Sequence, residues 1–235
     1  MGQAYRKSKY VEAEKKQKRK KLFVICISSV ALIAALTLII YIIAVNFGKI
    51  AEDKYPVATM EIEGYGTVEI TLYPNDAPNT VRNFIELANS GFYDGQIINR
   101  VCENFCIQAG SPDGTTSGGP GYGIKGEFKL NGFGRNKIKH EAGTISMARA
   151  QGNDTAGSQF FICPATNSSV SALDGNYAAF GKVTSGLDII VEISNVAHDS
   201  SLSSAGGGKP IKDIVIKSIT VDTKGIEYKA ADKIK

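Results

Sequence analysis

Residues 58–73, ATMEIEGYGTVEITLY, alternate apolar and polar side chains on both sides of the turn Gly64-Tyr65-Gly66. Such alternation places all the apolar side chains of a strand on the same face. Two runs of this kind joined by a short connection that contains glycine are typical of a β-hairpin. We therefore predict antiparallel strands over 58–63 and 67–73, with one face buried.

Residue patterns typical of β-strands recur along the chain up to residue 222. Six further apolar or β-branched runs follow the hairpin, at 96–101, 104–109, 143–149, 158–165, 178–183 and 211–221. Closing eight antiparallel strands on themselves removes the exposed sheet edges that invite aggregation. The predicted fold is therefore mainly β, a closed eight-stranded antiparallel barrel within a domain of residues 56–222.

Two short amphipathic helices are expected to cap this barrel. The first covers residues 79–90 and ends at Gly91, which suits the left-handed conformation after a helix. The second covers residues 186–193, with Ser185 available as its N-cap. Both present apolar side chains at helical spacing, so each is predicted to pack one face on the core.

Three segments of this region lack strand or helix patterns. Nine glycines between Gly110 and Gly134 predict a long loop, and a loop of that length in a compact domain is usually functional or mobile. Residues 200–208 are predicted to form a second flexible loop. Residues 223–235 form a charged tail that we expect to be unstructured.

The basic character of the chain is concentrated at its start. Residues 1–21 hold nine Lys/Arg against two acidic residues, a net charge of +7, which leaves −3 of the chain's total of +4 for the remainder. Residues 22–45 carry no charge, and a helix of that length, about 36 Å, would cross a hydrocarbon core of about 30 Å. Because basic flanks stay in the cytoplasm, we predict a cytoplasmic segment 1–21, a transmembrane helix 22–46 in the lipid bilayer, a tether 47–55 and an extracytoplasmic domain.

A cleaved signal peptide is the alternative interpretation of the apolar segment. Signal peptides carry a shorter apolar region, about 7 to 15 residues, followed by a small-x-small cleavage site. Here the apolar run is longer, and Ala44-Val45-Asn46 is a poor match to that site. We therefore expect one uncleaved anchor that precedes the barrel.

Composition excludes several classes of function. The near-neutral remainder of the chain lacks the dense basic face that phosphate backbones require, so no nucleic acid partner is expected. His140 and His198 are the only histidines, and no histidine, acidic or cysteine cluster has the spacing of a metal site or a catalytic triad. Hydrolysis by a triad or by a metal is therefore disfavoured.

The cysteines do not settle the redox compartment. Cys26, Cys102, Cys106 and Cys163 lack the spacing of a zinc or thioredoxin-like site. An oxidising compartment would permit one bridge, either Cys102 to Cys106 or Cys102 to Cys163. Both possibilities stay open at this point.

Six segments, taken together and in this order, resemble the cyclophilins. They are Asn99-Arg100-Val101, Asn104-Phe105-Cys106-Ile107-Gln108, Gly118-Gly119-Pro120-Gly121-Tyr122, Ser146-Met147-Ala148-Arg149-Ala150, Gly157-Ser158-Gln159-Phe160-Phe161-Ile162, and Leu173-Asp174-Gly175 followed by Phe180-Gly181-Lys182-Val183. The resemblance extends from about residue 58 to residue 222. It agrees with the barrel expected from periodicity.

The resemblance implies a peptidyl-prolyl cis/trans isomerase that binds Xaa-Pro segments and needs neither a cofactor nor a metal. It implies that Arg100 is the catalytic donor and that Gln108 and Phe105 act beside it. The substrate-binding residues that it implies are Cys106, Ala148, Arg149, Ala150, Gln159, Phe161, Leu173 and Tyr177. By contrast, His140 is expected to be structural and hydrogen-bonded.

The chain departs from the family pattern at the rim of the implied site. Asn99 stands where many members carry His, Cys106 where Met is usual, Ala172 where a Trp often lines the pocket, and Tyr177 where His is frequent. Because Ala172 removes a large apolar contact and a donor, we predict weak binding of cyclosporin. The segment around Arg149 is more similar to bacterial than to animal members, which favours a bacterial cell envelope.

Two functional hypotheses follow from this resemblance. In the first, the enzyme assists the folding of exported proteins at the outer face of the membrane. In the alternative, the domain is a proline-peptide-binding holdase or recruitment module that depends little on turnover.

Overall fold

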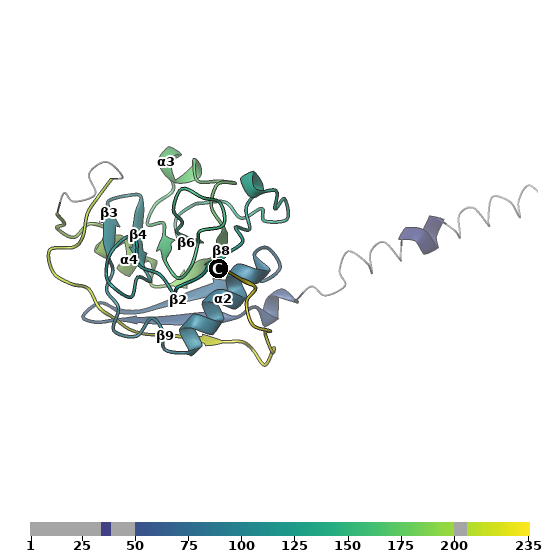
Figure 1. Ribbon diagram of the computed structural model, residues 1–235, viewed down its shortest axis with the longest axis horizontal. Helices are drawn as coiled ribbons and strands as arrows, with labels where there is room; N and C mark the ends of the chain where they lie inside the picture. The colour runs from purple at the N-terminus through teal and green to yellow at the C-terminus, as the bar shows by residue number, and fades with distance from the viewer. Residues whose placement is uncertain (1–33, 39–49, 200–205) are drawn as a thin grey trace, which may run out of the picture. The chain divides into compact units, whose positions relative to one another are not determined.

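The computed structural model of the protein describes residues 34–38, 50–199 and 206–235, and the compact unit Ile50–Lys235 holds the folded domain (Figure 1). In the described ranges no helix is both long enough and apolar enough to cross a membrane. The predicted basic segment 1–21 lies outside the described residues. So does the predicted span 22–46, apart from the helical turn at 34–38.

The predicted hairpin is confirmed. Strand β1 (Val57–Ile62) pairs antiparallel with β2 (Gly66–Leu72), in a register that sets Val57 opposite Thr71 and Ile62 opposite Gly66. Every second residue of β1 is buried, as alternation requires. The hairpin therefore contributes one apolar face to the core.

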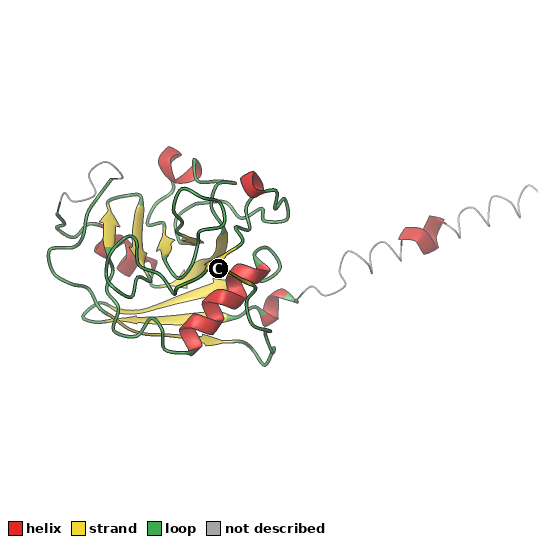
Figure 2. Cartoon of the chain, viewed as in Figure 1, coloured by secondary structure: helices red, strands yellow, loops and turns green. Residues whose placement is uncertain are grey.

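All eight predicted strands lie in one antiparallel sheet, in the order β3-β4-β7-β6-β8-β2-β1-β9. Figure 2 draws the strands in yellow. The strands after the hairpin are β3 (Arg100–Cys102), β4 (Cys106–Ala109), β6 (Thr144–Met147), β7 (Phe160–Ile162), β8 (Ala179–Ser185) and β9 (Ile216–Asp222). Most are shorter than the apolar runs that predicted them, since only part of each run enters a ladder.

The prediction of a closed barrel is wrong. The sheet is curled but open, with β3 and β9 as its two edges. Near these edges the described residues make isolated bridges and no ladder: Ile97 bridges to Val215, and Val101 bridges to Gly208. Strand β3 is only three residues long, and the chain that enters it is irregular, so no continuous ladder can form across the gap.

The two predicted helices are present. Helix α2 (Pro78–Asn89) packs one apolar face on the sheet, and α4 (Leu187–Ser194) follows β8. Ser185 does not cap α4, because it is still the last residue of β8; the N-cap is Gly186, with φ of 81° and no side-chain bond. The short elements α3 (Ser168–Ser171), η1 (Glu52–Lys54) and η2 (Lys129–Asn131) were not predicted, since one turn of helix carries no periodic signal.

Helix α2 begins without a cap of its own. Its N-cap residue Ala77 has no side-chain acceptor, and its first turn contains no acidic residue. Instead the buried carboxylate of Glu127, far along the chain, accepts hydrogen bonds from the backbone N–H of Asn79 (3.0 Å) and of Thr80 (2.8 Å) and from the Thr80 hydroxyl (2.8 Å). A distant loop residue therefore accepts the hydrogen bonds that the first backbone N–H groups of α2 would otherwise lack.

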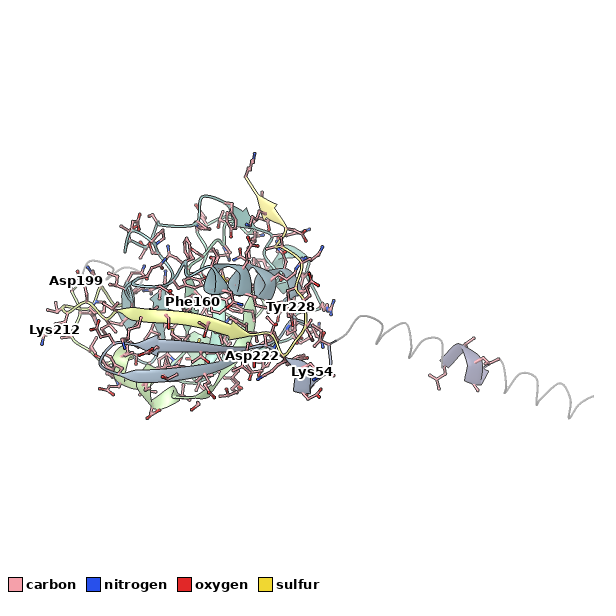
Figure 3. The ribbon with its side chains drawn as sticks, turned by 90° about the horizontal axis from the view of Figure 1, so that it is seen from below. Lys54, Phe160, Asp199, Lys212, Asp222 and Tyr228 are labelled. Carbon is pink, nitrogen blue, oxygen red and sulfur yellow. The ribbon has the colours of Figure 1, made fainter. Side chains whose placement is uncertain are left out.

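The core is centred on Phe84 of α2. Its ring meets the rings of Tyr93, Phe160 and Phe180 at centroid distances of 5.4, 5.5 and 5.2 Å. Phe160 is only 1% exposed and lies in the interior in the side-chain view (Figure 3). Because side chains alternate along a strand, Phe160 in the core directs its neighbour Phe161 to the opposite face of β7.

The prediction of an unstructured tail is wrong for the segment that ends the chain. Strand β10 (Lys233–Ile234) pairs antiparallel with β5 (Gly123–Ile124), and Asp232 exchanges hydrogen bonds with Asn79 and pairs with Arg82 on α2. The Lys233 ammonium lies 4.5 Å from the centroid of the Tyr122 ring. These partners are distant in sequence, so the local charge pattern could not predict them.

Candidate active site

A second apolar cluster lies apart from the main core. Its buried members are Cys106, Phe161, Cys163 and Val170, and the partly buried side chains packed on them are Cys102, Phe105, Ala148, Leu173 and Tyr177. Strands β4 and β7 position its centre, because Phe161 sits opposite Gln108 in the ladder between them. The sheet thus carries a separate apolar surface on the face opposite to the one that Phe160 occupies.

This cluster forms the wall of a hollow of about 220 Å³. Nine of the eleven predicted site residues line it, together with Thr116: Arg100, Phe105, Cys106, Gln108, Ala148, Arg149, Phe161, Leu173 and Tyr177. One wall is apolar and the rim carries polar donors. Such an arrangement suits a small ring attached to a polar backbone.

Arg100 is held in place on three sides. Its Nε donates to the carbonyl of Gly206 at 3.0 Å, and its Nη1 donates to Oε1 of Gln108 at 3.4 Å. Its guanidinium carbon lies 5.9 Å from the centroid of the Phe105 ring. Gln108 faces Arg100 directly in the ladder between β3 and β4, so the sheet itself sets this pairing.

A chain of hydrogen bonds links Arg100, through the buried side-chain amides of Gln108 and Gln159, to the glycine-rich loop. Gln108 Nε2 donates to Oε1 of Gln159 at 2.8 Å, and Gln159 Nε2 donates to the carbonyls of Thr116 (3.0 Å) and Gly118 (2.7 Å). Both glutamines are 8% exposed. Their fixed amides therefore connect the guanidinium to the loop that borders the hollow.

A groove of about 490 Å³ adjoins the hollow. The two share Gln108, Thr116, Ala148 and Arg149. The predicted residues Ala150 and Gln159 line this groove rather than the hollow, and so do residues 117–122 of the glycine-rich loop. Sequence reasoning missed Thr116, although the run of glycines around it marked the loop as a functional candidate.

His140 packs against Phe161, one of the residues that line the hollow. Its ring stacks on Phe161, with centroids 6.0 Å apart and planes 14° from parallel. Its side chain is fully buried, with Nδ1 3.1 Å from Asp174 Oδ1 and Nε2 3.0 Å from the Ser146 hydroxyl. The prediction of a structural, hydrogen-bonded histidine is confirmed.

A family model described as "Cyclophilin type peptidyl-prolyl cis-trans isomerase/CLD" matches residues 57–221. The chain belongs to this family. The cyclophilin domain is 48% identical to "Peptidyl-prolyl cis-trans isomerase B" of Bacillus subtilis over 134 residues, which is 57% of this chain and 87% of the relative. It is 45% identical to a peptidyl-prolyl cis-trans isomerase of Helicobacter pylori over 130 residues, 54% of this chain and 74% of that one.

A solved cyclophilin shares the fold. The crystal structure of the Cryptosporidium parvum cyclophilin type isomerase, in the presence of the dipeptide Ala-Pro, superposes with a TM-score of 0.60 at 32% identity. The match covers 71% of this chain and 98% of that one. The protein is thus a peptidyl-prolyl cis-trans isomerase with the cyclophilin fold.

The three cysteines of the cyclophilin domain are free thiols, of which Cys106 and Cys163 are buried and Cys102 is partly exposed. Cys102, Cys106 and Cys163 are free, so neither of the two bridges left open by the sequence is formed in the structure. Burial raises the pKa of Cys106 to about 12, against a smaller lowering by Arg100, and burial likewise raises the pKa of Cys163 to about 12. Cys106 therefore lines the hollow as a neutral apolar group and not as a nucleophile.

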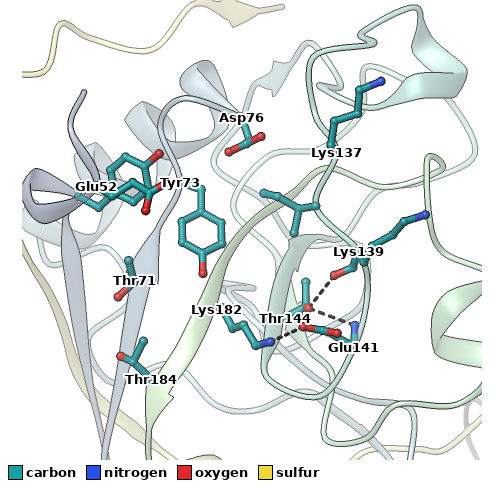
Figure 4. Close-up of a pocket in the computed structure, with 12 residues that line it drawn as sticks. Glu52, Thr71, Tyr73, Asp76, Lys137, Lys139, Glu141, Thr144, Lys182 and Thr184 are labelled. Atoms are coloured by element: carbon teal, nitrogen blue, oxygen red, sulfur yellow. Dashed lines mark hydrogen bonds and ion pairs between the residues drawn. The ribbon is translucent and has the colours of Figure 1, made fainter. Parts of the chain in front are cut away.

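A larger hollow, about 600 Å³, lies elsewhere in the cyclophilin domain (Figure 4). None of the predicted site residues lines it. Its walls carry six charged side chains, Glu52, Asp76, Lys137, Lys139, Glu141 and Lys182, and Lys182 pairs with Glu141 across it. A pyrrolidine ring needs an apolar wall, so size alone does not make this the site for proline.

The free energy of unfolding of the cyclophilin domain should fall on acidification below pH 6.5. Burial lowers the pKa of His140 from its ordinary 6.5, against the opposing effect of Asp174. Below pH 6.5 the unfolded chain therefore binds a proton that the folded chain excludes, and stability falls by at most about 1.4 kcal/mol per pH unit. Urea unfolding between pH 7.5 and 5.0 measures this slope.

The matched variant for this measurement is His140→Asn. It cannot titrate in this range, so its stability should depend less on pH than that of the parent chain, whatever its absolute value. Asp174 acts in a separate window: burial raises its pKa, but bonds from the His140 N–H and from Lys139 outweigh this and lower it, so its effect appears only near pH 3.8 and below. Equal slopes for parent and variant above pH 5 would contradict the assignment.

Proposed function

We propose that this isomerase accelerates the folding of exported proteins at the outer face of a bacterial cytoplasmic membrane, by turning Xaa-Pro bonds in the hollow beside Arg100. The observation that carries the catalytic part is the placement of one guanidinium at the edge of the apolar wall of Phe105, Cys106 and Phe161. The basic run at 1–21 and the uncharged run that follows it support the membrane part.

The chemistry of the bond explains why such a site suffices. Rotation about an Xaa-Pro bond breaks no covalent bond, but it must cross a barrier of about 18 to 20 kcal/mol, because amide resonance is lost midway. In the twisted amide the nitrogen lone pair is localised and becomes a better acceptor. A donor fixed toward that nitrogen therefore stabilises the transition state more than the planar ground state.

Each residue of the hollow has a proposed part in this step. The proline ring lies against Phe105, Phe161 and Leu173, which removes it from water. Arg100 then donates to the imide nitrogen as the bond turns. Its bonds to Gly206 and Gln108 hold it in place beforehand, so little reorganisation is needed at the moment of reaction.

The remaining lining residues are proposed to hold the peptide. Ala148, Arg149, Ala150 and Gln159 lie along the groove that leaves the hollow, where they would meet the backbone before the proline. Tyr177 closes the other side, with its ring edge-on to Phe161 at 5.7 Å between centroids. The groove thus fixes one side of the turning bond while the ring side rotates.

Protease shaving of intact bacteria that express the full chain tests the membrane location. In the proposed orientation, protease added outside the cells digests the cyclophilin domain and spares residues 1–21. A cytoplasmic protein serves as the control for cell integrity. A domain that stays protected until the cells are lysed would overturn the proposed orientation, and a domain released into the medium would favour a cleaved leader.

Cyclosporin should bind this protein weakly, and Ala172→Trp should tighten binding by about 10- to 100-fold. Ala172 is exposed at the C-terminal end of α3, next to Leu173 of the hollow, and does not itself line the hollow. An indole there would add roughly 100 Å² of apolar contact, about 2.5 kcal/mol, besides one donor. Isothermal titration calorimetry of both chains measures the change, and nanomolar binding by the parent chain would contradict it.

A further inference from the structure

The site carries an unbalanced positive charge. Among the described residues that line the hollow and the adjoining groove, Arg100 and Arg149 are the only charged side chains. No carboxylate from the part of the chain that the structure describes lines either space. A peptide that extends from the hollow into the groove therefore meets the guanidinium groups of Arg100 and Arg149, and no opposing charge from the described residues of the walls.

Arg149 is anchored at the boundary between the two spaces. Its guanidinium carbon lies 4.8 Å from the centroid of the Tyr177 ring and 5.1 Å from that of Phe128. Its Nε donates to the carbonyl of Asn176 at 3.1 Å, and its Nη1 donates to the carbonyl of Ala150 at 3.1 Å. These partners are rings and carbonyls, so they hold the group in place without neutralising it.

The carboxylates on the loops that border the groove are engaged elsewhere. Asp113 accepts from the backbone N–H of Thr115 and from two hydroxyls of its own loop, which lowers its pKa. Asp154 accepts from the N–H of Gly126 and from Asn131. Neither forms an ion pair with Arg149, whose charge remains available to a ligand.

We propose that Arg149 makes this isomerase select peptides that carry an acidic residue in one of the two positions before the proline. The proposal rests on the proposed binding of the peptide along the groove, and it adds the class of substrate that the groove prefers. A carboxylate of the peptide can approach the fixed guanidinium at little cost in side-chain order, because the rings already hold Arg149. A lysine in the same place meets a like charge and no acidic partner.

A peptide series measures this selectivity directly. Each peptide carries Glu, Gln or Lys at the first or second position before a single proline, and exchange NMR gives kcat/KM for the full chain without a coupled protease. The Gln peptide is the neutral match for Glu. We expect kcat/KM for Glu to exceed that for Lys by about fivefold in at least one position, and the ratio to shrink at 0.5 M salt.

Substitutions at Arg149 test whether its charge, or only its support of the local structure, matters for the selectivity. Arg149→Gln should bring the Glu/Lys ratio to about one, whereas Arg149→Lys should keep most of it. Lys217→Gln removes an equal charge from β9, outside both linings, and should leave the ratio unchanged. If Arg149→Gln lowered kcat/KM for all peptides alike and kept the ratio, Arg149 would be a support for the loop and the proposal would fail.

The outcome also distinguishes this inference from the proposed catalytic site. Turnover of the Gln peptide that does not depend on Arg100 would overturn the site itself. Turnover that depends on Arg100, with equal rates for Glu and Lys, would overturn only the selectivity.

Discussion

Replacing Arg100 with alanine should lower kcat/KM for proline isomerisation by about 10²- to 10³-fold, the loss typical of removing one preorganised donor. Arg100 is the donor that lies beside the apolar wall of the hollow, and Gln108 with Gly206 fixes its direction. Without it, the pyramidal nitrogen of the twisted amide faces no positive group. Exchange NMR on a short Ala-Pro peptide measures the loss.

Arg100→Lys is the matched control for charge. An ammonium keeps the positive charge, but its three N–H groups share one nitrogen, which cannot occupy the separate positions from which Nε and Nη1 of Arg100 donate to Gly206 and Gln108 and still face the imide. We expect it to recover only a small part of the activity. Far-UV circular dichroism must show an unchanged fold for both variants, because the bond from Arg100 to Gly206 also joins β3 to a loop.

Arg100→Ala also distinguishes the isomerase hypothesis from the holdase hypothesis. If the domain acts by binding alone, Arg100→Ala leaves the protection of an unfolded client intact, while Phe161→Ala abolishes it by removing the apolar wall. If turnover matters, Arg100→Ala slows a proline-limited refolding reaction as much as Phe161→Ala does. Equal refolding rates for the parent chain and Arg100→Ala would end the catalytic assignment.

Replacing Glu127 with alanine should lower the free energy of unfolding by about 3 kcal/mol. Its carboxylate, 5% exposed, is the acceptor for two backbone N–H groups and one hydroxyl at the start of α2, and the variant leaves these three donors buried without it. Each such donor costs about 1 to 3 kcal/mol, partly recovered if water enters. The carboxylate also meets the positive end of the helix dipole.

Urea unfolding and thermal scans measure this loss, which corresponds to a fall in Tm of about 6 to 12 °C. Glu127→Gln keeps one acceptor oxygen without the charge and should lose about half as much. Glu63→Ala, which removes an exposed glutamate beyond β1, is the control and should change stability by less than about 0.5 kcal/mol. A Glu127→Ala chain as stable as this control would show that α2 does not need its distant cap.

Local patterns predicted much of the fold. The alternation at 58–73 predicted β1 and β2 nearly to the residue, and helical spacing predicted α2 within one residue at each end. Both signals come from burial of one face, a property of consecutive residues. Prediction failed where an element depends on distant partners, as β10 does on β5, or where a helix is a single turn, as α3 is.

The candidate site was predicted from motifs, and its residues lie together in the structure. The motif order led to the eleven residues that line the hollow and the groove, but not to their division between the two spaces. Nor could it reveal Thr116, which lines the hollow and whose carbonyl accepts a hydrogen bond from Gln159, just before β7. That contact joins residues 43 apart, for which no local pattern exists.

By itself the sequence determined that this chain is a mainly β cyclophilin domain with an arginine beside aromatic residues, because alternation and motif order are properties of neighbouring residues. Only the tertiary structure decided that the sheet stays open, that Glu127 caps α2, that the tail ends in strand β10, and that Arg149 is anchored between two rings and lines the site without a carboxylate among the described lining residues. Each of these depends on which distant groups meet, and that is set when the whole chain packs.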